Sequence, residues 1–222
     1  MYADDIALMS PSIAGLRTLV SICESYGIEH DIVFHPKKSE CMYFIASKFG
    51  LTNDMVPPVY LSGKKLNVVL KHIYLGDVVM DNLSDEGDIR RQTRKFYCYA
   101  NSLIRKFSNC NNDVKVSLFR TYCTNMYCSQ VWWQYSQKCM NNLRVAYNNA
   151  FRILMSFPRD CSASGMCVTN RVPSFQALRR NLLYKFSVRL HSSDNSLLTK
   201  LLSSDAFVRS KFQVLFRKSV YF

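Results

Sequence analysis

The sequence predicts an α+β protein in which short strands and one helix precede an all-helical remainder. Short apolar runs separated by turn residues occur up to residue 80, whereas apolar residues recur at the helical period from residue 84 onward. The chain has 222 residues, of which 48% are apolar and 13% aromatic, and this composition suits packed cores rather than disorder.

The first part of the chain is expected to be mixed α and β. After a strand at 6–9, Ser10 can cap a helix, Pro11 suits its first position, and Gly27 suits its end. Further extended segments are expected at 28–34 and 41–45, joined by a turn at 35–39, and at 59–61, 66–70 and 73–80.

The remainder is expected to be helical. A helix over 84–107 begins with Asp85, Glu86 and Asp88, whose charges favour the positive end of the helix dipole. Pro158 ends a later helix because proline cannot continue the hydrogen-bond ladder. The other predicted helices are 113–135, 140–157, 174–191 and 196–217, with a loop over 159–170.

Charge is distributed unevenly along this basic chain. The net charge is +13, yet residues 1–40 carry a net charge of −3 and residues 89–120 a net charge of +7. A basic field attracts phosphate and gains affinity through counterion release. The distribution therefore predicts a polyanionic partner for the helical part.

The basic residues of the helix over 89–107 share one face. At about 100° per residue they fall within a sector of about 160°, opposite the apolar positions. We predict that this face contacts phosphates, and an ordinary solvated face is the alternative. Trp132 and Trp133, with Tyr122, Tyr127 and Tyr135, could stack on bases, but we expect aromatic side chains of a helical bundle in its core. The predicted nucleic-acid-binding residues are Arg90, Arg91, Arg94, Lys95, Arg105 and Lys106.

The cysteines and the apolar runs bear on the compartment. The nine cysteines are odd in number and form no tight CxxC pair, so we expect reduced thiols and no structural metal. No apolar run approaches the roughly 20 residues that span a bilayer, and the N-terminus lacks a secretory signal. We expect an intracellular protein, nuclear or cytoplasmic, without a membrane partner.

Asp4 and Asp5 form an adjacent carboxylate pair on a tight turn before an apolar run. Magnesium prefers oxygen ligands, and phosphoryl transfer uses two metal ions that clamp the attacking and leaving oxygens. Taken alone, the pair fits a solvated acidic turn or a helix cap much better than a metal site.

Several motifs in order resemble one enzyme family. Tyr2-Ala3-Asp4-Asp5, the Lys37-Lys38-Ser39-Glu40 turn, His72-Ile73-Tyr74-Leu75-Gly76 and the stretch 149–159 resemble the reverse transcriptase of non-LTR (LINE-type) retrotransposons, from its YADD motif onward. The resemblance implies the C-terminal part of the palm over 1–83, a helical thumb-like bundle over 84–158, and a helical C-terminal extension over 159–222.

The resemblance also implies roles for single residues. Asp4 and Asp5 would be catalytic and hold magnesium, Asp4 as the main ligand. Lys38, with Lys37 as an adjacent competitor, would act on the leaving pyrophosphate, and a solvated turn lysine is the alternative. The positions near the primer would be Tyr2, Ala3, Tyr74, Leu75 and Gly76, with sheet packing as the alternative for the last three.

The implied activity is RNA-directed DNA synthesis, with an RNA template and a DNA primer, or their RNA–DNA duplex, as partners. The family's remaining metal-binding aspartate and its fingers would precede residue 1, which makes the N-terminal part of the same polyprotein a further expected partner. We therefore expect this chain alone to bind nucleic acid without polymerising. The alternatives are a non-enzymatic nucleic-acid-binding helical protein and a decayed retrotransposon relic.

Overall fold

The computed structural model describes residues 5–44, 56–210, 213–214 and 216–217. Over these residues the protein is mixed α+β, with eight α-helices and six short strands, as predicted at this level. The chain divides into two compact units, which we call the strand unit (Met1–Tyr74 with Val78–Leu83) and the helical unit (Leu75–Asp77 with Ser84–Phe222). No helix of the described residues is long and apolar enough to cross a membrane.

Helix α1 (Ile13–Glu29) lies in the strand unit and differs from its prediction at both ends. Ser12, not Ser10, is the N-cap, because its hydroxyl accepts a hydrogen bond from the Gly15 amide at 3.1 Å. The helix continues past Gly27, which is buried inside it. A Cβ at position 27 would lie 2.7 Å from the Ile32 carbonyl oxygen, so glycine serves close packing there rather than helix termination.

The strands are shorter than predicted, and residues 6–9 and 28–34 form none. Residues 28–29 complete α1, because the helix continues beyond the glycine that was expected to end it. Strand pairing depends on partners distant in sequence, which an apolar run alone does not reveal. The observed strands are β1 (Glu40–Cys41), β2 (Tyr60–Leu61), β3 (Lys64–Lys65), β4 (Asn67–Val68), β5 (Lys71–Tyr74) and β6 (Asp77–Met80).

Three two-stranded pairs and α1 build the strand unit. β1 pairs with β4 in parallel, β2 with β3 as an antiparallel hairpin, and β5 with β6. The Glu24 carboxylate on α1 accepts a hydrogen bond from the Ser62 amide in the β2–β3 turn. The small core of this unit consists of Val20, Cys41, Val59, Leu61 and Leu66.

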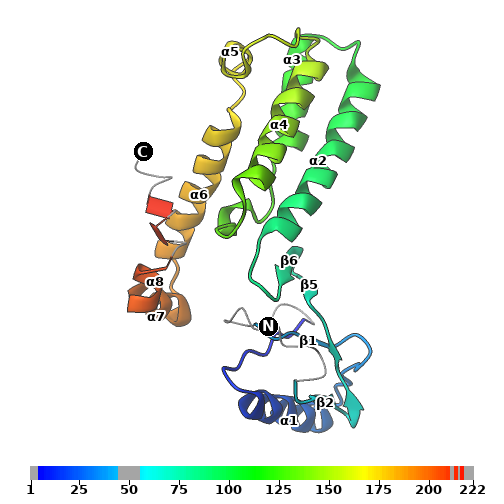
Figure 1. Ribbon diagram of the computed structural model, residues 1–222, viewed down its shortest axis with the longest axis vertical. Helices are drawn as coiled ribbons and strands as arrows, with labels where there is room; N and C mark the ends of the chain where they lie inside the picture. Colours follow the sequence, from blue (N-terminus) through cyan, green and yellow to red (C-terminus); the bar gives the residue numbers. More distant parts are fainter. Residues whose placement is uncertain (1–4, 45–55, 211–212, 215, 218–222) are drawn as a thin grey trace. The chain divides into compact units, whose positions relative to one another are not determined.

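Helices α2 (Glu86–Phe107), α3 (Asn112–Cys123) and α4 (Gln137–Leu154) run side by side in the helical unit (Figure 1). Aromatic rings fill the space between them: Phe119 lies 5.2 Å from Tyr147 and 4.8 Å from Phe151, between ring centroids. Tyr147 is fully buried, and its hydroxyl donates to the Pro173 carbonyl at 2.7 Å. This core fixes the side of α2 that faces inward.

The helix predicted over 113–135 is divided. α3 ends at Cys123, Cys128 adopts a left-handed conformation, and a 3-10 helix, η2 (Ser129–Val131), follows. The turn brings Trp132 into the core, where its indole bonds to Asp88. This long-range contact overrides a helical pattern that was continuous in the sequence. Trp132 is buried, as predicted for a core aromatic, whereas Tyr122 and Tyr127 are exposed, so the prediction of a core position was wrong for these two tyrosines.

The described residues of the C-terminal part form four α-helices, with further helical residues at 213–214 and 216–217, where a loop and two longer helices were predicted. α5 (Ala163–Thr169) lies within the predicted loop, and α6 (Phe175–His191) matches the predicted 174–191 helix. The predicted 196–217 helix breaks at Ser204, which has an extended backbone and caps the next helix through the Phe207 amide. The resulting segments are α7 (Ser196–Ser203) and α8 (Asp205–Val208).

Candidate nucleic-acid interface

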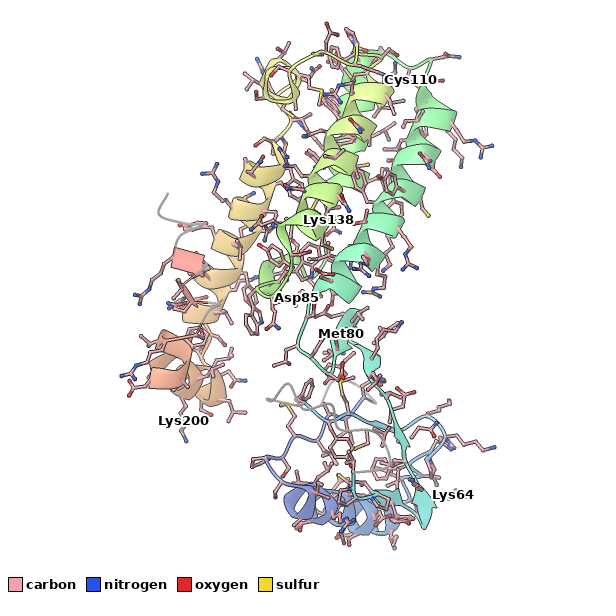
Figure 2. All side chains as sticks on the ribbon, in the orientation of Figure 1. Lys64, Met80, Asp85, Cys110, Lys138 and Lys200 are labelled. Carbon is pink, nitrogen blue, oxygen red and sulfur yellow. The ribbon has the colours of Figure 1, made fainter. Side chains whose placement is uncertain are left out.

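Helix α2 separates a buried apolar side from an exposed basic side. Ile89, Phe96, Ala100 and Leu103 are buried against the neighbouring helices. Figure 2 shows nitrogen-tipped side chains on the side of α2 that faces away from α4. The basic residues that are exposed there, which we call the basic face, are Arg90, Arg94, Lys95, Arg105 and Lys106.

The basic face carries little compensating negative charge. After Asp88, α2 contains no acidic residue. Arg90 pairs with Glu86 one helical turn away, at 2.8 Å, but its side chain remains largely exposed. Solvent and salt screen such exposed pairs, so they contribute little to stability. The basic face therefore presents its charge to solvent.

Arg91 was predicted to contact phosphate, and the structure places it differently from its neighbours. Its side chain is half-buried, and it pairs with Asp88 at 2.9 Å. It also donates to the carbonyl oxygen of Gly76. A helical projection puts Arg91 among the other cations, so only the long-range contact distinguishes it.

Asp88 is a buried carboxylate that joins distant segments, a role that sequence reasoning missed. It is 1% exposed, its Oδ1 accepts from Arg91, and its Oδ2 accepts from the Trp132 indole at 3.0 Å. A buried carboxylate is tolerated when its oxygens are hydrogen-bonded and paired with a cation. The sequence indicated only a charge favourable to the start of a helix.

Two acidic residues before Asp88, namely Asp85 and Glu86, form hydrogen bonds with the segment that leads into α4. Asp85 Oδ2 accepts from the amides of Trp133 at 2.7 Å and Gln134 at 2.6 Å. Burial raises the pKa of Asp85, although these hydrogen bonds act in the opposite direction. Glu86 accepts from the Ser136 amide at 3.2 Å, and hydrogen bonding to Ser136 lowers the pKa of Glu86.

The turn predicted to lie near a primer is also part of this region. Leu75 and Gly76 both have positive φ, 47° and 81°. The Tyr127 hydroxyl donates to the Leu75 carbonyl at 2.9 Å, and the Tyr127 ring lies against Gly76. Tyr74, the preceding residue, is partly buried at the end of β5.

The predicted catalytic residues are described only in part. Tyr2, Ala3 and Asp4 lie outside the described residues, and Asp5 is exposed. Lys38 is exposed in a turn before β1, where its amide donates to the His35 carbonyl at 3.0 Å. The described residues contain no group of three or more His, Cys, Asp or Glu side chains that could hold a metal ion.

A second group of cations lies on α6. Arg179 lies over the ring of Tyr135, 5.4 Å from its centroid, and donates to its hydroxyl at 3.1 Å. The Arg179 side chain is thus engaged by Tyr135, whereas the side chains of Lys185 and Arg189 are exposed.

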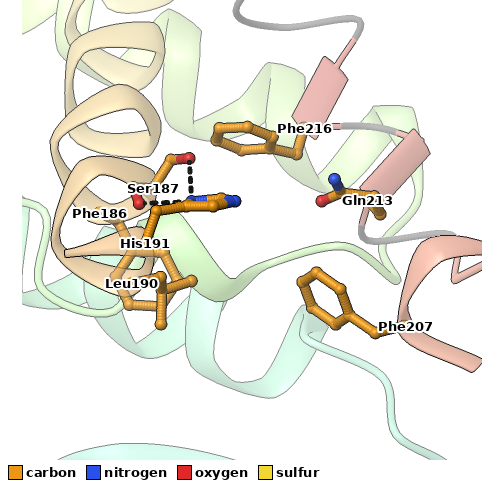
Figure 3. Close-up of a pocket in the computed structure, with 7 residues that line it drawn as sticks. All are labelled: Phe186, Ser187, Leu190, His191, Phe207, Gln213 and Phe216. Carbon is orange, nitrogen blue, oxygen red and sulfur yellow. Dashed lines mark hydrogen bonds between the residues drawn. The ribbon is translucent and has the colours of Figure 1, made fainter. Parts of the chain in front are cut away.

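A small hollow near the C-terminus contains none of the predicted site residues. Its lining is mainly aromatic and aliphatic, and His191 Nδ1 contacts the Ser187 carbonyl at 2.9 Å (Figure 3). The lining contains no Asp, Glu, Lys or Arg side chain. The lining residues are Phe186, Ser187, Leu190, His191, Phe207, Gln213 and Phe216.

Among the described residues, the basic face of α2 is thus the strongest candidate for a nucleic-acid interface. No protein-family model, curated protein or solved structure matches the chain.

Proposed function

We propose that the chain is the C-terminal part of an RNA-directed DNA polymerase of a non-LTR retrotransposon, and that its helical unit binds primer–template duplex. The observation that carries the proposal is the exposed basic face of α2, opposite that helix's buried side. The ordered motifs from Tyr2 to Arg159 support the choice of family.

The dimensions of the basic face suit a nucleic-acid backbone. At about 1.5 Å per residue, the distance from Arg90 to Lys106 along α2 is about 24 Å. This length corresponds to about seven phosphate spacings of one strand of a duplex. Contacts of this kind hold the duplex in place without reading its sequence, which suits a polymerase thumb.

In the complete enzyme, Asp4 and Asp5 would hold magnesium, which stabilises charge on the reacting phosphate, and Lys38 would act on the leaving pyrophosphate. The Leu75–Gly76 turn, with Tyr74, would lie near the primer. The partners are the RNA template, the DNA primer and the N-terminal part of the same polyprotein. The chain alone binds nucleic acid without extending a primer.

Salt-dependent binding tests the proposal. If all five cations of the basic face contact phosphates, the logarithm of the binding constant should fall with the logarithm of salt concentration with a slope of about −4.5. The variant Arg94→Gln/Lys95→Gln/Arg105→Gln should reduce the magnitude of this slope by about three. Fluorescence anisotropy with an RNA–DNA duplex measures both quantities.

A charge-matched variant provides the control. Lys64→Gln/Lys65→Gln/Lys71→Gln removes the same charge from exposed positions of the strand unit. The salt slope of this control variant should differ by less than about one from the salt slope of the unchanged protein, because the phosphate contacts are made by α2. Equal losses in both variants, or affinity that does not depend on salt, would refute the assignment to α2.

A second candidate is a non-enzymatic nucleic-acid-binding protein, which the described geometry favours because the basic face is complete without Asp4. Templated primer extension with magnesium, with and without Asp4→Asn, separates the two. Extension by the chain joined to its upstream polyprotein segment, and its loss in the variant, supports the polymerase. Binding without extension in that longer chain supports the non-enzymatic protein.

A further inference from the structure

Two side chains hold the turn Leu75–Asp77, which belongs to the helical unit. Arg91 Nη2 donates to the Gly76 carbonyl, and the Tyr127 hydroxyl donates to the Leu75 carbonyl at 2.9 Å. The donors come from different segments, one from α2 and the other from the stretch before η2. The turn is therefore fixed at two consecutive residues from two directions.

The backbone of the turn is one that needs such support. Leu75 has a φ of 47°, which is uncommon for a residue with a branched side chain, and Gly76 has a φ of 81°. A Cβ at position 76 would lie 3.2 Å from Cε1 of Tyr127, so the ring packs directly on the glycine. Sparsely populated backbone conformations persist where the surroundings over-determine them.

Arg91 is itself held in a fixed position. Its guanidinium donates through Nε and Nη2 to Oδ1 of Asp88, at 3.2 Å and 2.9 Å. Asp88 is buried and bonded on its other oxygen to Trp132. The planar guanidinium suits this bidentate role, which a lysine cannot reproduce.

The position of Arg91 relates the turn to the basic face. Arg91 follows Arg90 directly and precedes Arg94 by less than one helical turn, at the N-terminal end of that face. The Gly76 carbonyl that it binds therefore lies beside the start of the row of cations. Leu75 and Tyr127 are partly or largely exposed there, at 38% and 53%.

We propose that Arg91 and Tyr127 are positioning residues, which fix the Leu75–Gly76 turn at the N-terminal end of the basic face so that it meets the 3′ end of a bound primer. The inference rests on the proposed function, from which it takes the primer as ligand. Under this inference, Arg91 makes a contact within the protein and not the phosphate contact that the sequence had predicted.

The two parts of this surface should contribute separately measurable properties. The exposed cations of α2 supply affinity for any duplex, and this affinity depends on salt. The turn supplies preference for a duplex with a recessed primer end. Changes in Arg91 or Tyr127 should therefore reduce end preference and leave the salt slope unchanged.

The experiment compares two labelled RNA–DNA duplexes of equal length, one with a recessed primer 3′ end and one closed by hairpin loops at both ends. The full chain should bind the recessed duplex more tightly. Tyr127→Phe removes one hydroxyl and should lower this preference about two- to tenfold, the range that one hydrogen bond supports. Arg91→Lys should act similarly, because it keeps the charge and loses the paired geometry.

Matched controls separate positioning from general effects. Tyr122→Phe removes a hydroxyl from an exposed tyrosine of α3, and Arg209→Lys keeps the charge at an exposed position outside the basic face; neither should change end preference. Tyr127→Phe retains the ring against Gly76, so it tests the inference even where an Arg91 variant fails to fold.

Three results would overturn the inference. They are equal binding of both duplexes by the unchanged chain, an equal loss for both duplexes in Tyr127→Phe, and a salt slope reduced by about one in Arg91→Gln, which would show a phosphate contact. If neither duplex bound with salt dependence, the proposed function itself would fail. Lower end preference with an unchanged slope supports the inference.

Discussion

The indole Nε1 of Trp132 donates a hydrogen bond of 3.0 Å to the carboxylate of Asp88, 44 positions earlier in the chain. The contact joins the first turn of α2 to the segment that leads into α4. Asp85 and Glu86 bind the amides of the same segment. The start of α2 is therefore held by side chains whose charges also suit its dipole.

Asp88→Asn should destabilise the helical unit. Removing one partner of a buried ion pair costs about 3–5 kcal/mol, and because the Arg91 side chain retains 22% exposure, we expect about 1–3 kcal/mol. Urea unfolding followed by circular dichroism measures the change. Asp113→Asn, at an exposed position of α3, should alter the free energy of unfolding by less than about 0.5 kcal/mol. Equal effects of the two substitutions would contradict the assigned role of Asp88.

Gly76→Ala should cost more than Gly63→Ala. Both glycines have positive φ, 81° and 72°, so alanine is strained at either position by about 1 kcal/mol. Only at position 76 does the added Cβ also meet the ring of Tyr127, whereas position 63 has nothing within 4 Å. Hydrogen exchange of the amides around each turn measures the local cost. A smaller increase in hydrogen exchange for Gly76→Ala than for Gly63→Ala would show that the Tyr127 ring moves aside at little cost.

Cys98 should react with maleimide before the other described cysteines. It is exposed in the middle of the basic face, whereas Cys123 is 1% exposed and burial raises its pKa to about 12. Mass spectrometry after timed labelling measures the order of reaction. Saturating RNA–DNA duplex should slow the labelling of Cys98 and leave partly buried Cys23, in the strand unit, unchanged. A labelling rate of Cys98 that is the same with and without bound duplex would argue against this face as the interface.

Asp85 should make stability depend on pH with a definite sign. Burial raises its pKa in the folded state above the ordinary value of 3.8, so the folded state binds the proton more tightly than the unfolded state. Its contribution to the free energy of unfolding is therefore present below about 3.8 and is lost as pH rises through the folded-state pKa. Compared with Asp85→Asn, the unchanged protein should lose relative stability in urea unfolding as the pH rises from 3.8 through the folded-state pKa of Asp85.

Glu86 should show the opposite dependence and serves as the control. Hydrogen bonding to Ser136 lowers its pKa below the ordinary 4.5, so its contribution is present above that value and is lost as pH falls through the folded-state pKa. Glu86→Gln should therefore cost stability near neutral pH and cost less in acid. The same sign for both variants would contradict the separate environments of the two carboxyls.

How far the sequence predicted the fold depended on the range of the interactions involved. The helix over 84–107 and the helix over 174–191 were predicted within about two residues, because period and caps are local signals. The predicted strand over 28–34 and the long helix over 113–135 were wrong, because close packing at Gly27 and burial of Trp132 depend on distant contacts.

The candidate site shows the same division. The exposed side of α2 followed from helical spacing, since five of its six predicted cations are exposed. The role of Arg91 did not follow, because nothing in its local sequence distinguishes it from Arg94. The role of Tyr127 did not follow either, since it was predicted only as a core or base-stacking aromatic, and nothing in its local sequence indicates that its hydroxyl reaches Leu75.

The two sides of α2 also differ in how they tolerate substitution. Changes at Phe96 or Leu103 alter the core, whereas changes at Arg94, Lys95 or Arg105 remove charge from solvent and leave the packing intact. Exposed substitutions commonly change stability by less than about 0.5 kcal/mol. Under the proposed function, affinity for a duplex should therefore change one cation at a time, during evolution or by design, without loss of the folded bundle.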